Sequence, residues 1–113
     1  IEFKNVTKRF GKRTVLDNVD LRIRDGHVTT IIGKSGTGKS VLLKHIIGLM
    51  KPDSGEILFR GRPLASFSGK ERKSLKRKFS YMFQNNALFD SLTVFENVAL
   101  PLKYTTKLKK KEI

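Results

Sequence analysis

The feature of this sequence that most constrains its fold is a glycine-rich loop at residues 33–40, which read GKSGTGKS. The loop matches the phosphate-binding pattern G-x-x-x-x-G-K-[ST] completely. The β-branched segment VTTII at residues 28–32 precedes it, and the apolar segment VLLKHII at residues 41–47 follows it. The pattern requires this order of strand, loop and helix, so we favour a phosphate-binding loop over an accidental glycine-rich turn.

The residue types in the loop suit a polyphosphate. Glycines let backbone N–H groups approach phosphate oxygens closely, and the N-terminus of a helix favours negative charge. We expect Lys39 to reach the β- and γ-phosphates of a nucleoside triphosphate and the Ser40 hydroxyl to ligate Mg²⁺. The expected nucleotide-binding residues of this loop are Gly33, Lys34, Ser35, Gly36, Thr37, Gly38, Lys39, Ser40 and Val41.

Length and composition limit the class of protein. A chain of 113 residues is one domain's worth of material, and 38% hydrophobic with 30% charged residues suits a soluble globular domain. No apolar run approaches the roughly 20 residues that a membrane-spanning helix needs, and the N-terminal residues do not read as a secretory signal. The absence of cysteine excludes disulfides and thiolate metal sites and fits a cytosolic setting.

The net charge of +14 suggests a polyanion partner, but its distribution weakens that interpretation. Much of the excess lies in two runs, KERKSLKRK at residues 70–78 and KYTTKLKKK at residues 103–111. Such runs are more often solvated helix faces than dedicated sites. The two histidines, His27 and His45, lack metal-ligand spacing, so we expect packing or surface roles for both.

Hydrophobic periodicity predicts an α/β arrangement. Alternation over residues 3–23 predicts an antiparallel subsheet, with turns at residues 11–12, 17–18 and 25–26. Residues 28–32 lack alternation and predict a strand buried on both faces. The segment after the loop is apolar nearly all round and predicts a core helix that ends near Gly48, before a short strand at residues 56–60.

Two further helices are predicted in the second half of the chain. Ser68-x-x-Glu71 and Thr93-x-x-Glu96 both fit the capping box, in which a hydroxyl and a glutamate satisfy free amides at a helix start. Pro101 is expected to kink or end the second of these helices. Between them, residues 79–83 predict a strand that ends at Gln84.

With these motifs in place, the chain resembles the ATP-binding cassette (ABC) family over essentially its whole length. The resemblance implies an α/β fold of the P-loop NTPase, ABC ATPase type, with an N-terminal antiparallel β-subdomain. Residues 1–113 would form part of one nucleotide-binding domain, with residues 1–84 as its core and residues 85–113 as the start of a helical subdomain that is not completed. The segments that carry the resemblance, besides the loop, are VTKRFG, VLDNVDLRIRDGHVTTIIG, KPDSGEILFRG and FSYMFQNNALFDSLTVFENVALPL.

The resemblance also implies site residues outside the loop. Phe10 lies where the family stacks an aromatic ring on adenine, and Gln84 lies at the glutamine that meets Mg²⁺ or the attacking water. Lys39 and Gln84 are thus the expected catalytic residues, and Ser40 and Gln84 the expected metal ligands. The alternatives are that Phe10 is a core residue and that Gln84 is an ordinary exposed loop amide.

Within the family, the segment GKSGTGKSVLLKHIIGLMKPDSGEI is most similar to the ATPase of Mla-type (Mce-associated) phospholipid transporters. Most cassette ATPases have threonine where Val41 stands, so this position offers only its amide. Lys34 replaces the commoner proline or glutamate and adds positive charge to the loop.

The function implied by the resemblance is that of an ATP-binding subunit that couples ATP binding and hydrolysis to transport of phospholipid or another hydrophobic solute. The implied partners are an integral membrane permease and a second ATPase subunit in a head-to-tail dimer, on the cytoplasmic face of the inner membrane, with no specific nucleic acid. The sequence lacks the LSGGQ-like signature, the Walker B aspartate and the switch histidine, so we expect these residues alone to bind ATP and Mg²⁺ with negligible hydrolysis. The alternatives are a soluble ABC protein acting on nucleic acid or ribosomes, and a P-loop kinase of small molecules.

Overall fold

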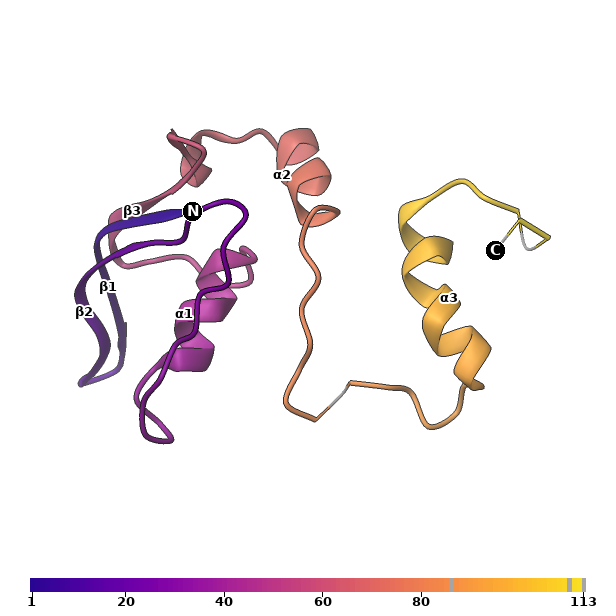
Figure 1. Cartoon of the computed structure of the whole chain (residues 1–113), viewed down its shortest axis with the longest axis horizontal. Coiled ribbons are helices and arrows are strands. Elements are labelled where there is room, and N and C mark those ends of the chain that lie inside the picture. The colour runs from indigo at the N-terminus through magenta and orange to yellow at the C-terminus, as the bar shows by residue number, and fades with distance from the viewer. Residues whose placement is uncertain (86, 110, 113) are drawn as a thin grey trace. The chain divides into compact units, whose positions relative to one another are not determined.

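The computed structural model describes residues 1–85, 87–109 and 111–112. The chain divides into two compact units, residues 1–79 and residues 80–113, and each is described by itself. The second unit contains the helix α3 (Val94–Thr105). The first unit contains β1 (Glu2–Phe10), β2 (Arg13–Arg22), α1 (Lys39–Ile46), β3 (Ser54–Phe59), β4 (Arg62–Pro63), the 3₁₀ turn η1 (Leu64–Ser66) and α2 (Gly69–Lys76) (Figure 1).

The first unit is built on an antiparallel sheet with the strand order β2-β1-β3-β4. β1 and β2 form a hairpin around the turn at residues 11–12, with Phe3 opposite Leu21 and Phe10 opposite Arg13. The predicted antiparallel subsheet and the strand near residues 56–60 are therefore confirmed.

The predicted turn at residues 17–18 is wrong, because both residues lie inside β2. Asn18 has a left-handed backbone (φ 49°), and its N–H donates to the Thr7 hydroxyl at 3.0 Å. On the facing strand, Asn5 has the same φ of 49°, and its N–H donates to an Asp20 carboxylate oxygen at 2.8 Å. Asparagine tolerates this left-handed conformation. Asn5 and Asn18 therefore lie at irregularities in the pairing of β1 with β2, and the chain does not reverse its direction at residues 17–18.

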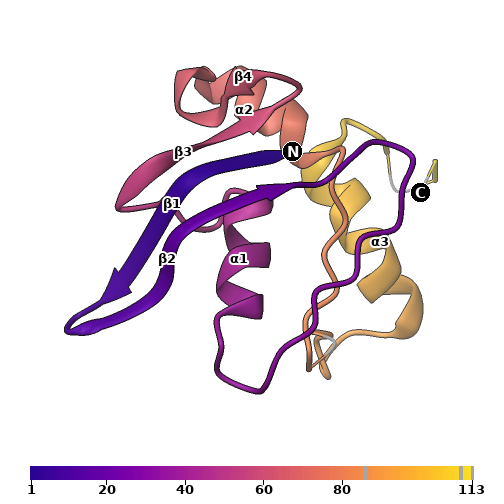
Figure 2. The same cartoon turned by 60° about the vertical axis from the view of Figure 1, so that its left-hand side comes forward.

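The core lies between the sheet and α1, which runs along the sheet (Figure 2). Only one face of α1 is covered, since Leu42 is buried whereas Leu43 is 39% exposed. The expectation that this helix is enclosed on all sides is therefore wrong for the described residues, because the sheet covers a single side of it. The buried cluster consists of Phe3, Val6, Leu16, Leu42 and Ile57.

Neither residues 28–32 nor residues 79–83 form the strands that their composition predicts. Val28 is 97% exposed and Ile32 is 91% exposed, and within this segment only Ile31 packs against the core, where it is partly buried. A strand exists only where a neighbouring strand supplies hydrogen-bond partners, and the described residues place no strand beside either segment.

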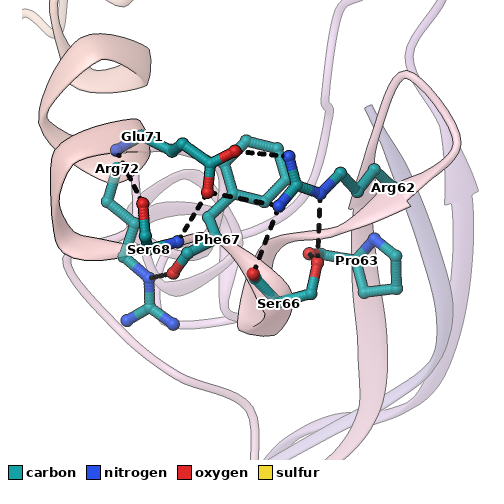
Figure 3. Close-up of polar contacts among 7 residues, drawn as sticks. All are labelled: Arg62, Pro63, Ser66, Phe67, Ser68, Glu71 and Arg72. Carbon is teal, nitrogen blue, oxygen red and sulfur yellow. Dashed lines mark hydrogen bonds and ion pairs between the residues drawn. The ribbon is translucent and has the colours of Figure 1, made fainter.

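An ion pair joins β4 to the start of α2 (Figure 3). The Arg62 guanidinium donates to both Glu71 carboxylate oxygens, at 2.6 Å and 3.2 Å, and Glu71 also accepts the Ser68 N–H at 2.8 Å. The Arg62 hydrogen bond is the largest of the causes that lower the pKa of Glu71 to about 2. The predicted capping box is confirmed, and the outer face of α2 carries exposed lysines, as expected for a solvated helix face.

The second unit contains α3, whose predicted capping box between Thr93 and Glu96 is confirmed. Pro101 does not end this helix, which continues to Thr105. Within the described part of the chain, every helix is too short or too polar to span a bilayer.

Gly55 should be the glycine of the sheet that tolerates substitution least. Its φ is +79°, and a Cβ there would lie 2.2 Å from the Asn5 carbonyl oxygen in β1. Gly61 is a matched control, because its φ is +80° but a Cβ there meets nothing within 4 Å. We expect Gly55→Ala to lower the free energy of unfolding by about 1–3 kcal/mol more than Gly61→Ala does, as measured by chemical denaturation. Equal losses would contradict the close approach of β3 to β1.

Candidate nucleotide-binding site

The phosphate-binding loop is positioned by the contact between the start of α1 and β2. Gly38 is the N-cap residue of α1 and has a φ of 96°. A Cβ at Gly38 would lie 2.9 Å from both the carbonyl oxygen and the Cγ1 of Val15. Only glycine allows this backbone conformation at this distance, so the sequence permits the helix to begin directly against the strand.

The side chain of Lys39 folds back over the loop that precedes it. Its ammonium donates to the carbonyl of Gly33 and, at 2.5 Å, to the carbonyl of Lys34. The Thr37 hydroxyl donates to the same Lys34 carbonyl at 2.7 Å. These contacts place a positive charge among the loop's own carbonyl groups, at the N-terminus of α1.

The electrostatics of the loop favour an anion. The first turn of α1 has no acidic residue, and no side chain in the described part of the chain caps it. The N–H groups of a first helical turn lack partners within the helix and carry partial positive charge. The exposed Lys34 and the half-buried Lys39 add two full charges beside them. This combination of backbone donors and ammonium groups is the arrangement that binds phosphate at helix N-termini.

The predicted loop residues 33–41 follow one another around this helix start, and their side chains divide by environment. Ser40, the second residue of α1, has an exposed side chain. Val41 is half-buried and packs against the core, and its contribution of only an amide to the site stays a prediction. The remaining side chains of the loop that are exposed belong to Lys34, Ser35 and Thr37.

Phe10 lies at the end of β1 with 45% of its surface exposed. The Lys8 ammonium lies 5.7 Å from the centre of its ring. The alternative that Phe10 is a core residue is therefore wrong, and its stacking on adenine stays a prediction.

Arg13 joins the end of the hairpin to the loop, and no sequence motif marked it. It lies opposite Phe10 in the β1–β2 pairing, and its guanidinium donates to the Gly36 carbonyl at 2.7 Å. The sequence signal that could have pointed to Arg13 was the predicted turn at residues 11–12, because a two-residue turn places residues 10 and 13 side by side.

Gln84 belongs to the second unit and lies exposed in a turn. The strand expected to carry it is not formed, and its approach to the phosphates stays a prediction. The Ser40 hydroxyl and the Gln84 amide, which belong to different units, each carry an oxygen of the kind that Mg²⁺ accepts as a ligand, so each residue by itself fits the predicted ion. Among the described residues, no three His, Cys, Asp or Glu side chains gather into a metal site.

The two histidines have the packing and surface roles expected of them. His45 is fully buried in α1, with its Nδ1 2.8 Å from the Val41 carbonyl oxygen. His27 is exposed, with its Nδ1 2.8 Å from the Asp25 carbonyl oxygen.

Comparison with known proteins agrees with this geometry. The sequence profile of the family described as ABC transporter matches residues 16–113. The probable ribonucleotide transport ATP-binding protein mkl of Mycobacterium leprae is 43% identical over 113 residues, which are 100% of this chain and 33% of that protein. The intermembrane phospholipid transport system ATP-binding protein MlaF of Haemophilus influenzae is 41% identical over 108 residues, which are 96% of this chain and 41% of that protein.

A solved structure has the same fold. The ATP-binding cassette MJ0796, described as a dimeric bacterial ABC transporter cassette, aligns with a TM-score of 0.82 and 35% identity, covering 98% of this chain and 51% of that one. A second structure of MJ0796 is described as a post-hydrolysis state bound to ADP and Pi. The predicted fold class is confirmed, and the chain spans about half of the solved cassette and less than half of the two relatives named above.

The exposure of Phe10 leads to a test of its predicted role. Phe10→Ala should weaken ATP binding by about 1–3 kcal/mol, which is the range measured for stacking of a base on an aromatic ring. Binding of inorganic triphosphate, which has no base, should not change, and Phe10→Tyr should retain most of the ATP affinity. Calorimetric titration measures the ATP and triphosphate affinities of Phe10→Ala and the ATP affinity of Phe10→Tyr. An equal loss for ATP and triphosphate would show that Phe10 acts on the loop rather than on the base.

Proposed function

The chain belongs to the ABC transporter family, and from this premise we propose that its loop binds ATP with Mg²⁺ as part of the ATP-binding subunit of a membrane transporter. Members of this family are ATPases. The observation that carries the proposal is the Lys39 ammonium, held over the loop at the uncapped start of α1. Neighbouring main-chain donors and a cation together fit the polyphosphate of a nucleotide.

In the proposed complex, each part of the site takes one part of the nucleotide. The amides of about residues 36–40 bind the phosphate oxygens, and Lys39 exchanges the Gly33 and Lys34 carbonyls for the β- and γ-phosphates. This exchange replaces bonds to neutral acceptors with stronger charge-assisted bonds. Phe10 covers the adenine. Ser40 and Gln84 would hold Mg²⁺, which when bound neutralises charge on the phosphate oxygens.

The transporter proposal extends to partners and cargo. Two cassettes would close head to tail over ATP, and the dimeric state of MJ0796 supports the pairing of two cassettes. A permease in the membrane would be the second partner, with the ATPase on the cytoplasmic face of the inner membrane.

We propose phospholipid or a related hydrophobic solute as cargo, supported by the similarity to MlaF, although mkl is named for ribonucleotide transport. The alternatives that act on nucleic acid, ribosomes or small-molecule acceptors receive no support from these names.

Hydrolysis is proposed to require more than the residues of this sequence. Phosphoryl transfer needs a positioned water and groups that stabilise charge on the γ-phosphate. Residues 1–113 contain Lys39 and Gln84 but no LSGGQ-like signature. We therefore expect these residues alone to bind ATP and to hydrolyse it at a negligible rate.

Lys39→Ala tests the central part of this proposal. Loss of the ammonium should weaken binding of ATP with Mg²⁺ about 10- to 100-fold, because it removes charge-assisted bonds to two phosphates. The fold should persist, since the described hydrogen bonds of the Lys39 side chain go to carbonyls of its own loop. Equilibrium titration with a fluorescent ATP analogue measures the affinity.

Lys70→Ala is the matched control, because it also removes one ammonium but from the exposed face of α2. Its affinity for ATP should stay within about twofold of the unmodified protein, since exposed charges outside a site contribute little. If Lys39→Ala behaved like this control, the phosphate role of Lys39 would be refuted.

A further inference from the structure

We propose that Arg13 is a positioning residue of the phosphate-binding loop: its guanidinium fixes the orientation of the peptide bond between Gly36 and Thr37, so that the Thr37 amide faces the phosphates. The inference rests on the proposed function, because it assigns a role within the same nucleotide site.

The contact that carries the proposal joins β2 to the middle of the loop. Arg13 is the first residue of β2, and one of its guanidinium nitrogens lies 2.7 Å from the Gly36 carbonyl oxygen. The same nitrogen would lie 3.9 Å from a Cβ built on Gly36, so the guanidinium lies alongside the backbone of this residue. The contact joins residues 23 positions apart in the sequence.

The geometry of a trans peptide turns this contact into control of an amide. The described peptide bonds are all trans, and in a trans peptide the carbonyl of one residue and the N–H of the next point in opposite directions. With the Gly36 carbonyl held toward Arg13, the Thr37 N–H has to point away from it. Gly36 has a φ of +77° and no side chain, so without such a hold this peptide could rotate at little steric cost.

The other contacts inside the loop act on two different peptides, one of them through the Lys39 bond to the Gly33 carbonyl. The Lys39 ammonium and the Thr37 hydroxyl both bind the Lys34 carbonyl. Among the described hydrogen bonds, the Gly36 carbonyl accepts one from Arg13, which is a residue outside the loop. The loop is held by its own side chains at the Gly33 and Lys34 carbonyls and by Arg13 of the sheet at the Gly36 carbonyl.

The position of Arg13 also relates the two ends of the proposed nucleotide site. Arg13 lies directly opposite Phe10 where the hairpin closes. The ring proposed to cover adenine and the guanidinium that holds the phosphate loop are thus presented by one pair of residues. Arg13 keeps the phosphate loop in a fixed place relative to this end of the hairpin.

Arg13→Ala should weaken binding of both ATP and inorganic triphosphate by about three- to tenfold, as expected for an exposed hydrogen bond from a charged donor. Both ligands should lose the same factor, because the change acts on the loop and not on the base. In the nucleotide-free protein, the backbone amide resonance of Thr37 should shift or broaden in the variant, because its peptide is no longer held. Calorimetry and ¹⁵N-resolved NMR measure these effects.

Arg22→Ala is the matched control, because Arg22 is the exposed last residue of the same strand. This variant should leave both affinities and the Thr37 resonance unchanged. Arg13→Lys keeps the charge and one donor, so it should recover part of the affinity and should fold if Arg13→Ala does not.

Three results would overturn the proposal. The first is an Arg13→Ala affinity equal to that of Arg22→Ala. The second is a loss for ATP without a loss for triphosphate, which would place Arg13 on the base side. The third is a loss for both ligands with an unchanged Thr37 resonance, which would make Arg13 a direct phosphate ligand. If the unmodified protein bound neither ligand, the proposed function would fail, while the resonance would still test the Arg13 contact.

Discussion

The packing of the start of α1 against β2 is the contact on which the site depends. Leu42 anchors the helix in the core, and Gly38 lets its first turn approach Val15 more closely than any side chain would allow. The loop before α1 is therefore formed at a fixed place beside the sheet. From that place Arg13 can reach Gly36, and among the described residues no side chain caps the N–H groups at the start of the helix.

The Lys39 ammonium has a structural role in the loop in addition to its proposed role in binding phosphate. Its ammonium donates to two carbonyls of the loop, so the folded protein keeps a cation in place, and the first turn of α1 brings no carboxylate to it. A carboxylate at this point would compete with phosphate for the same donors. Neutral carbonyls hold the charge weakly enough to be replaced by a phosphate oxygen, and the same loop can then serve as both scaffold and ligand.

Features that depend on neighbouring residues could be predicted from the sequence, and features that depend on distant pairing could not. The phosphate loop and the capping boxes at Ser68 and Thr93 are local patterns, and the structure forms them. The strand composition of residues 28–32 is also local, but a strand needs a partner that no local pattern specifies. Arg13 was missed for the same reason, because its importance comes from a contact with Gly36 across 23 residues.

The measurement that tests the account most directly is a crystal structure of the protein with Mg²⁺ and a non-hydrolysable ATP analogue. The account predicts that the Lys39 ammonium leaves the Gly33 and Lys34 carbonyls and lies about 2.7–2.9 Å from phosphate oxygens, with the loop amides around the same phosphates. A structure in which Lys39 keeps its two carbonyls while the nucleotide binds elsewhere would contradict it.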